Sequence, residues 1–262
     1  MRWVEGNVTW LVRRILAASA VVSLGAAGLF GVEVQRARIS PRDDYGPVLD
    51  LGSGTGPKVV WLGDSTASGV GVHRAEDALP RQVATMTGRV EQVISLAVSG
   101  ARAHDVVAHQ VGAVPADASV VVIDIGANDV VHGALTRTYR HQYEEVLARV
   151  PRHASVVVLG VPDMGSPPRL DQPLRSLVGW RGRAFDAVVR SLAHGHHLAY
   201  VDIAGHTGPS FRHDPARYFA ADRYHPNATG YRLWAEAVAP ILSQAIAGAV
   251  ADAGRAPPAG RG

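Results

Sequence analysis

The chain has 262 residues, enough for one sizeable α/β domain with an appendage, and 47% hydrophobic with 19% charged residues is typical of a folded globular protein. The formal net charge is only +3, and the 26 Lys and Arg residues are spread along the chain, so there is no basic stripe of the kind that nucleic-acid-binding proteins carry. The absence of cysteine excludes disulfides, thiolate metal sites, cysteine nucleophiles and lipidation at cysteine.

An uncharged, mostly apolar stretch at residues 15–32 follows Arg13 and Arg14. As a helix it would be about 27 Å long, close to the hydrocarbon thickness of a bilayer. Basic residues on its N-terminal side favour a cytoplasmic N-terminus and an exported C-terminal part. We therefore predict that residues 1–34 form a membrane anchor or a signal segment. An uncleaved anchor at the cell membrane is the favoured interpretation; a cleaved signal peptide, which would leave the protein secreted, and a buried amphipathic helix are the alternatives.

The rest of the chain divides into three parts by composition. Residues 35–57 are rich in Gly, Pro and charge and are expected to link the anchor to a domain. That domain is expected over 58–250, and residues 251–262 are expected to form a disordered tail.

Within the domain, short apolar runs alternate with helical patterns. Five runs predict strands: Val59–Leu62, Val90–Leu96, Val120–Ile125, Val156–Val161 and Ala199–Ile203. Apolar residues at helical spacing predict helices around Tyr139–Val150, Phe185–Leu192 and Tyr231–Leu242, with Pro240 expected to end or kink the last. This alternation predicts a parallel sheet with helices on both faces, and ligands bind beyond the carboxyl ends of such strands.

The first predicted strand runs into Gly63-Asp64-Ser65. A serine directly after a buried strand lies at the mouth of the sheet, near the N-terminus of the helix that follows. There its hydroxyl is exposed and its backbone N–H can meet a developing oxyanion. Taken alone, however, the tripeptide is more typical of a turn or a helix cap than of a nucleophile.

Three later segments add donors and a base. The second and third strands lead to Gly100, whose backbone N–H can donate, and to Asn128, whose amide can donate where charge develops. Asp222 precedes His225 by three residues, in a turn stiffened by Pro226. A carboxylate at this spacing can orient the imidazole through its Nδ1–H, so that Nε2 can take a proton from a serine hydroxyl.

These segments resemble, in order and spacing, the sequence blocks of the SGNH (GDSL-like) hydrolase superfamily, in particular its lysophospholipase/arylesterase-like branch. The resemblance spans residues 63–226 and implies a flavodoxin-like, three-layer α/β/α sandwich around a five-stranded parallel sheet. It implies neither a cofactor nor a metal. The site residues that it implies are the nucleophile Ser65, its triad partners Asp222 and His225, and the oxyanion-hole donors Ser65, Gly100 and Asn128.

Two features depart from the family pattern, and neither removes a catalytic group. Thr66 stands where many members have leucine, and the asparagine often found before the glycine of the second block is absent. Asp64, Asp124 and Asp129 lie in or at the ends of predicted strands. By the resemblance, Asp64 and Asp129 are expected to be structural and to accept backbone hydrogen bonds.

Several histidines lie outside these blocks. His194, His196 and His197 could be metal ligands, but they fall where a helix is expected to end, and cationic histidine is favourable there for electrostatic reasons alone. His132 and His213 are expected at the surface or in loops; as an alternative, His132 follows the Asn128 loop closely enough to line the pocket.

The resemblance predicts a serine esterase for carboxylic, and also thio-, esters with short to medium acyl chains, supplied by a small molecule or a lipid. Pro162–Arg175 and Gly205–Ala221 are expected to shape the acyl pocket. An envelope acyltransferase or a carbohydrate O-deacetylase would use the same triad. A third alternative is a non-catalytic, membrane-tethered binding protein, although the complete residue set argues against it. The sequence leaves the oligomeric state open.

Overall fold

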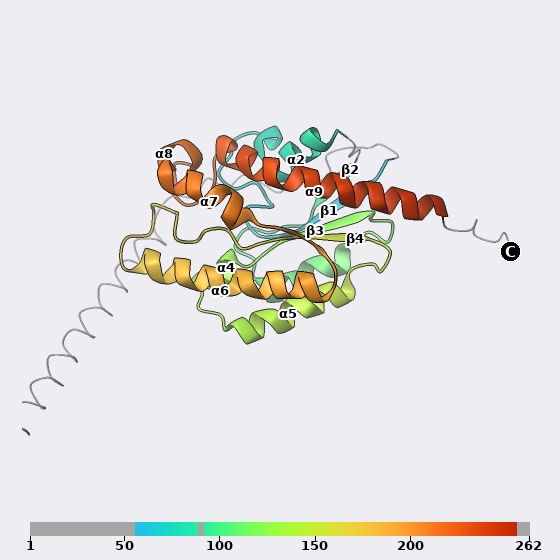
Figure 1. Cartoon of the computed structure of the whole chain (residues 1–262), viewed down its shortest axis with the longest axis horizontal. Coiled ribbons are helices and arrows are strands. Elements are labelled where there is room, and N and C mark those ends of the chain that lie inside the picture. The colour runs from blue at the N-terminus through green and yellow to red at the C-terminus, as the bar shows by residue number, and fades with distance from the viewer. Residues whose placement is uncertain (1–55, 89–91, 256–262) are drawn as a thin grey trace, which may run out of the picture.

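The computed structural model describes residues 56–88 and 92–255 (Figure 1). The predicted N-terminal hydrophobic helix, almost all of the predicted linker and residues 256–262 lie outside the described residues, so the predictions made for them stay predictions. The described residues form a three-layer α/β/α sandwich, in agreement with the predicted fold class.

The middle layer is a five-stranded sheet in the order β2-β1-β3-β4-β5, and every neighbouring pair is parallel. All five predicted strands are present, with bounds β1 Lys58–Gly63, β2 Gln92–Ser95, β3 Val120–Asp124, β4 Ser155–Leu159 and β5 Ala199–Val201. Side chains alternate between the two faces: Val59 and Trp61 belong to one core cluster, whereas Val60 and Leu62 belong to the other. Burial on both faces explains why the strands read as continuous apolar runs.

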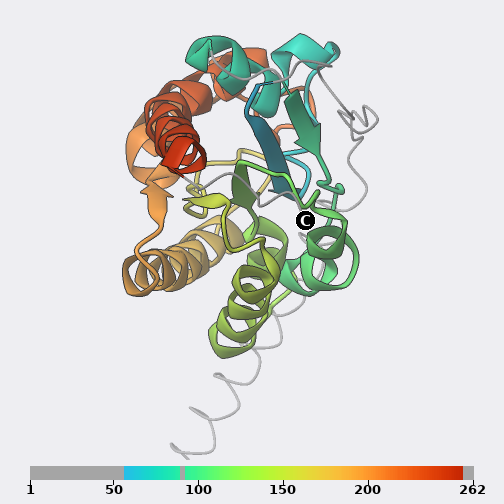
Figure 2. The same cartoon turned by 90° about the vertical axis from the view of Figure 1, so that its right-hand side faces the viewer.

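Helices cover both faces of the sheet (Figures 1 and 2). One layer contains α2 Leu79–Thr87, α7 Ile203–His213, α8 Pro215–Tyr218 and α9 Ala228–Arg255. The other contains α3 Ala103–Asp105, α4 Ala127–Val131, α5 Thr136–Arg149 and α6 Leu174–Gly195. Short 3-10 and π turns complete the chain: η1 Ala75–Asp77, η2 Val106–Gln110 and η3 Val111–Ala113.

The fifth strand is shorter than predicted, because a helix begins inside the predicted range. The carboxylate of Asp202 accepts the backbone N–H of Gly205 at 2.8 Å, and this cap starts α7 at Ile203. The apolar run therefore crosses from strand to helix without a change in hydrophobicity.

The last helix is longer than predicted. Pro240 does not end α9, which continues to Arg255 and so includes residues 251–255 of the predicted tail. Val238, Leu242 and Ile246 are buried in the core cluster on either side of the proline, and burial of a large aliphatic side chain stabilises by about 1.5–3 kcal/mol. Within the described residues, α9 is also the one helix long and apolar enough to span a membrane, but its buried face packs on the core.

Candidate active site

Ser65 lies at the carboxyl edge of the sheet, directly after β1. No helix starts there, contrary to the prediction: Ser65–Gly71 form a run of turns, and α2 begins only at Leu79. The turn is closed by a 2.9 Å hydrogen bond from the N–H of Val70 to the carbonyl of Ser65. The nucleophile candidate is therefore held by a tight turn and not by a helix N-terminus.

His225 lies within hydrogen-bonding distance of both other predicted triad side chains, Ser65 and Asp222. Nε2 of His225 is 2.9 Å from Oγ of Ser65, and Nδ1 is 2.5 Å from Oδ2 of Asp222. All three residues are buried, with at most 8% of their surface exposed. The fold thus brings together groups from β1 and from the loop before α9.

The electrostatics of Asp222 favour its ionised form. Burial raises its pKa. The hydrogen bond and the charge of His225, together with the backbone N–H groups of His225 and Tyr224, lower the pKa by more than burial raises it, so the net pKa lies below the usual value. These two N–H groups donate to Oδ1 at 3.0 and 2.9 Å. An ionised Asp222 fixes the imidazole proton on Nδ1 and leaves Nε2 as an acceptor toward Ser65.

Hydrogen bonds and a close backbone approach fix the histidine loop and the serine turn. The N–H of Ala220 donates to the carbonyl of His225 at 2.8 Å, and the hydroxyl of Tyr231 on α9 donates to the carbonyl of Val70 at 2.6 Å. Gly71 has a φ of +101°, and a Cβ at this position would lie 2.4 Å from the carbonyl oxygen of Pro226. Only glycine allows the two segments to approach so closely.

Of the predicted oxyanion donors, Asn128 lines the cavity and Gly100 does not. Asn128, at the start of α4, lines the same cavity as Ser65, and its Nδ2 donates to Oδ2 of Asp64 at 3.2 Å and to the carbonyl of Ala101 at 3.0 Å. Gly100 lies in an exposed turn after β2, with a φ of +83° that favours glycine, and is not among the residues that line the cavity. Its part in an oxyanion hole stays a prediction.

Asp64 and Asp129 make the backbone hydrogen bonds expected of them. Oδ1 of Asp64 accepts the N–H of Thr66 at 3.2 Å, and Oδ2 of Asp129 accepts the N–H of Ala103 at 3.0 Å. Burial raises the pKa of Asp129 to about 6. Burial and the neighbouring Asp124 raise the pKa of Asp64 to about 7, and burial raises that of Asp124 to about 6.

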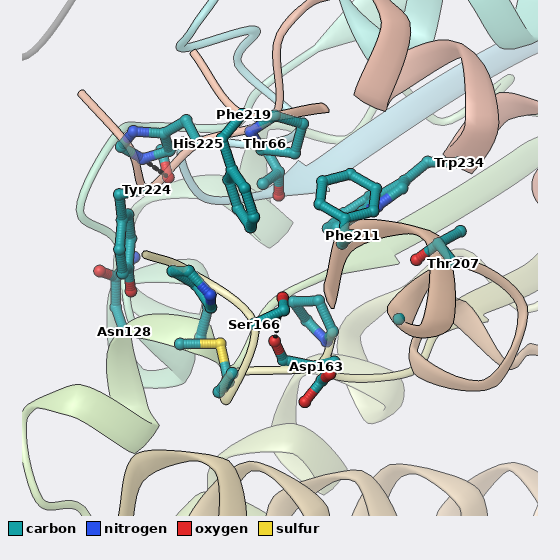
Figure 3. Close-up of a pocket in the computed structure, with 17 residues that line it drawn as sticks. Thr66, Asn128, Asp163, Ser166, Thr207, Phe211, Phe219, Tyr224, His225 and Trp234 are labelled. Atoms are coloured by element: carbon teal, nitrogen blue, oxygen red, sulfur yellow. Dashed lines mark hydrogen bonds between the residues drawn. The ribbon is translucent and has the colours of Figure 1, made fainter. Parts of the chain in front are cut away.

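The cavity beside Ser65 has a volume of about 40 Å³. Both segments expected to shape it contribute to its wall, through Met164 and Pro167 from the first and Phe211 and Phe219 from the second. In Figure 3, His225 and Asn128 lie toward one end and Trp234 toward the other. Trp234 falls within the predicted helix Tyr231–Leu242, but a helical pattern of apolar residues does not distinguish a core position from a pocket wall.

Two predictions about histidines have different outcomes. His132 is exposed and does not line the cavity; its Nδ1 instead lies 2.8 Å from the carbonyl oxygen of Asn128, one helical turn earlier. The expected surface position of His132 is thus confirmed, and the alternative that it lines the pocket is wrong, because the end of α4 carries the ring to the surface. His194, His196 and His197 lie where α6 ends, as predicted. Among the described residues, no group of three or more His, Asp or Glu side chains is arranged to hold a metal ion.

Residues 61–233 match the model of the GDSL-like lipase/acylhydrolase family. The chain belongs to this family. It is 32% identical over 266 aligned positions to a GDSL-like esterase of Mycobacterium tuberculosis, covering 88% of this chain and 81% of that protein. These matches confirm the resemblance to the SGNH hydrolase superfamily, and they identify the protein as a serine ester hydrolase.

Solved structures show the same fold. A phospholipase A1 of Streptomyces albidoflavus superimposes with a TM-score of 0.55 at 23% identity, covering 72% of this chain and 99% of that one. A lipase/acylhydrolase of Enterococcus faecalis gives a TM-score of 0.56 at 22% identity, covering 72% and 96%. At these identities the likeness supports the α/β/α architecture of this GDSL-like hydrolase and nothing finer.

Proposed function

We propose that this GDSL-like hydrolase cleaves carboxylic esters with short acyl chains, with Ser65 as nucleophile, His225 as general base and acid, and Asp222 as the carboxylate that orients the imidazole. The observation that carries the proposal is the continuous contact from Asp222 through His225 to Oγ of Ser65, at 2.5 and 2.9 Å. Nucleophile, base and orienting group are then all within reach of one another.

The chemistry follows from this order of contacts. Nε2 of His225 takes the hydroxyl proton as Oγ of Ser65 bonds to the acyl carbon. The carbonyl electron pair moves onto oxygen, and its return expels the alcohol, which takes the proton from His225. Water then attacks the acyl-serine and gives its proton to His225, and this proton returns to Oγ as the carboxylic acid leaves.

The oxyanion would be held by the backbone N–H groups of Ser65 and Gly100 and by the amide of Asn128. Asn128 is supported by its position in the wall of the cavity. Both of its amide hydrogens are donated to protein acceptors, Asp64 and the carbonyl of Ala101, so an oxyanion would have to share or replace one of these hydrogen bonds. Ala101 follows Gly100 directly in the chain, so one of these acceptors belongs to the segment of the other predicted donor.

The cavity supports a preference for the short end of the acyl range. A water molecule needs roughly 10–15 Å³ of such volume, so about 40 Å³ corresponds to a few non-hydrogen atoms. Phe211, Phe219 and Trp234 are each less than 10% exposed and close the apolar side of the cavity. This volume favours short acyl groups, acetyl to butyryl, over longer chains, which would have to displace these rings or extend out of the cavity. Thioesters with the same acyl groups would fit equally.

Two measurements test the proposal. A serine-directed fluorophosphonate should label the wild type but not Ser65→Ala, and labelling that survives the substitution would falsify the assignment of the nucleophile. In a chain-length series of p-nitrophenyl esters, kcat/KM should be highest for acetate to butyrate. Activity only on long chains, or on none, would contradict the acyl preference.

An envelope acyltransferase or a carbohydrate O-deacetylase is the second candidate. A wider hollow of about 420 Å³ shares Phe219 with the acyl cavity and is lined by Pro168, Ala220 and Arg223 among others. It offers room for a sugar-sized alcohol. Product analysis with and without an alcohol acceptor separates hydrolysis from transfer, and release of acetate from an acetylated sugar identifies a deacetylase. A binding protein without catalysis would show neither product nor label.

We also propose that the enzyme works at the outer face of the cell membrane, anchored by residues 15–32. A group of exposed apolar side chains near the carboxyl edge of the sheet supports this location, because apolar side chains exposed together often mark a contact surface. They are Val131, Leu135, Leu177 and Trp180, on or beside the packed helices α4 and α6. Membrane fractionation of the full chain, with protease treatment of intact cells, tests it; recovery in the cytosol would contradict it.

A further inference from the structure

Beneath the nucleophile lie two buried carboxyl groups that the proposed reaction does not use. Asp64 follows β1 and Asp124 ends β3, and the two residues are 1% and 5% exposed. The strands place them together: Gly63 is in register with Asp124, and the N–H of Asp64 donates to the carbonyl of Asp124 at 3.3 Å. The hydroxyl of Thr66 lies between them, 2.7 Å from Oδ2 of Asp124 and 3.1 Å from Oδ1 of Asp64.

The hydroxyl of Thr66 has one hydrogen and therefore can donate to only one of these oxygens. If both carboxyls were ionised, the other contact would set a hydroxyl lone pair against a buried carboxylate. If one carboxyl carries a proton, it donates to Oγ1 of Thr66, and Oγ1 donates to the other. In either arrangement of that proton, both short contacts are hydrogen bonds.

The surroundings disfavour two charges. In the described part of the chain, no lysine or arginine forms a hydrogen bond or an ion pair with either carboxyl, and uncompensated buried charges are costly. The titratable groups around the pair offer no permanent cation. They are Asp129 on α4, Tyr139 and Tyr143 on α5, Asp222 and His225 in the loop before α9, and Tyr231 on α9. Burial raises the pKa of both Asp64 and Asp124, as a retained proton requires.

We propose that Asp64 and Asp124 hold one proton between them across the hydroxyl of Thr66, and that this pair positions the amide of Asn128. Oδ2 of Asp64 accepts Nδ2 of Asn128, so the chain of contacts runs from Asp124 through Thr66 and Asp64 to the cavity wall. Asp124 and Thr66 are thus positioning residues. The second half of the proposal rests on the proposed role of Asn128 as an oxyanion donor.

The first experiment measures stability and needs no activity. The folded wild type keeps a proton that the unfolded chain loses near pH 4, so its free energy of unfolding should fall as the pH rises from 4 toward 7. In Asp124→Asn, the amide donates permanently to Oγ1 of Thr66, so the part of this fall that comes from the pair should shrink. The part that comes from Asp129, whose pKa burial raises to about 6, should remain. Urea unfolding followed by circular dichroism at several pH values measures both chains. An unchanged pH dependence in Asp124→Asn would overturn the shared proton.

Thr66→Val gives a second measurement of stability, which decides the question if Asp124→Asn does not fold. The hydroxyl of Thr66 makes two hydrogen bonds to the singly protonated pair but only one to the doubly ionised pair, so its loss should move the fall to lower pH. The same pH dependence as in the wild type would overturn the proposal.

Catalysis tests the link to Asn128. Thr66→Val should lower kcat about three- to tenfold at unchanged KM, which corresponds to one hydrogen bond, and Thr66→Ser, which restores the hydroxyl, should recover kcat. A wild-type kcat in Thr66→Val, or equal losses in the valine and serine variants, would overturn the positioning role. Loss of the Ser65 assignment in the labelling experiment would leave the stability result untouched, so the two failures are distinguishable.

Discussion

Three buried carboxyl groups lie close to Ser65 in space, and the chemistry of Asp222 is opposite to that of the pair Asp64 and Asp124. Asp222 accepts three N–H groups, two from the backbone and one from an imidazole that can carry a positive charge, and its net pKa is lowered. Asp64 and Asp124 face each other across a single hydroxyl, and their pKa values are raised. Burial is common to both groups. The number of donors and the sign of the neighbouring charge decide which carboxyl keeps its proton.

The largest difference between the two groups should appear in kcat. Asp222→Asn keeps the shape of the side chain but no longer fixes the imidazole proton on Nδ1, and we expect kcat to fall roughly 10⁴-fold. Asp64→Asn, the matched change in the other group, should cost on the order of tenfold, because it weakens a support of Asn128 and not the base itself. Steady-state kinetics on p-nitrophenyl acetate measure both, and equal losses would break the comparison.

The next largest effect on kcat should come from Asn128, the proposed oxyanion donor that is hydrogen-bonded to Asp64. Asn128→Ala should lower kcat about 10²–10³-fold with little change in KM, because the amide is expected to bind the oxyanion more strongly than the ground-state carbonyl. His132→Ala is the control: the ring lies one turn away on α4 but is exposed and outside the cavity. A similar loss in both variants would point to damage of α4 and not to a missing donor.

A smaller effect, on stability and kcat, should distinguish a steric clash beside the triad from backbone strain alone. Gly71 and Gly88 both have a positive φ, but a Cβ at Gly71 would lie 2.4 Å from the carbonyl oxygen of Pro226. A Cβ at Gly88 would have no atom of the described residues within 4 Å. Gly88→Ala should cost about 1–2 kcal/mol of stability and leave kcat unchanged. Gly71→Ala should cost more stability and also lower kcat, because the loop of His225 must shift. Thermal unfolding and kinetics of the two variants decide it.

Some contacts of the site could be predicted from the sequence, and others could not. The spacing from Asp222 to His225 is local, and the ends of apolar runs fix which side chains meet at the carboxyl edge, so the fold and the contacts among the triad side chains could be predicted. The contact of Thr66 with Asp124 could not, because it depends on the register of two strands that are 58 residues apart along the chain. The length of α9 was missed for a related reason, since burial on both sides of Pro240 overrides the local preference of proline.

The smallest effect is also the one that sets the two groups directly against each other. A carboxyl with a lowered pKa in the folded state stabilises the fold above its unfolded pKa, and this contribution is lost as the pH falls through the folded pKa. Asp222 should therefore make the protein more stable as the pH rises toward 4, whereas the pair of Asp64 and Asp124 should make it less stable as the pH rises above 4. Asp222→Asn should remove only the gain on the acid side. Asp124→Asn should reduce only the fall above pH 4, and the share of that fall that comes from Asp129 should remain. Denaturant unfolding of the two variants between pH 3 and 8 measures both slopes. A single variant that flattened the whole profile would show that the carboxylates titrate as one coupled network.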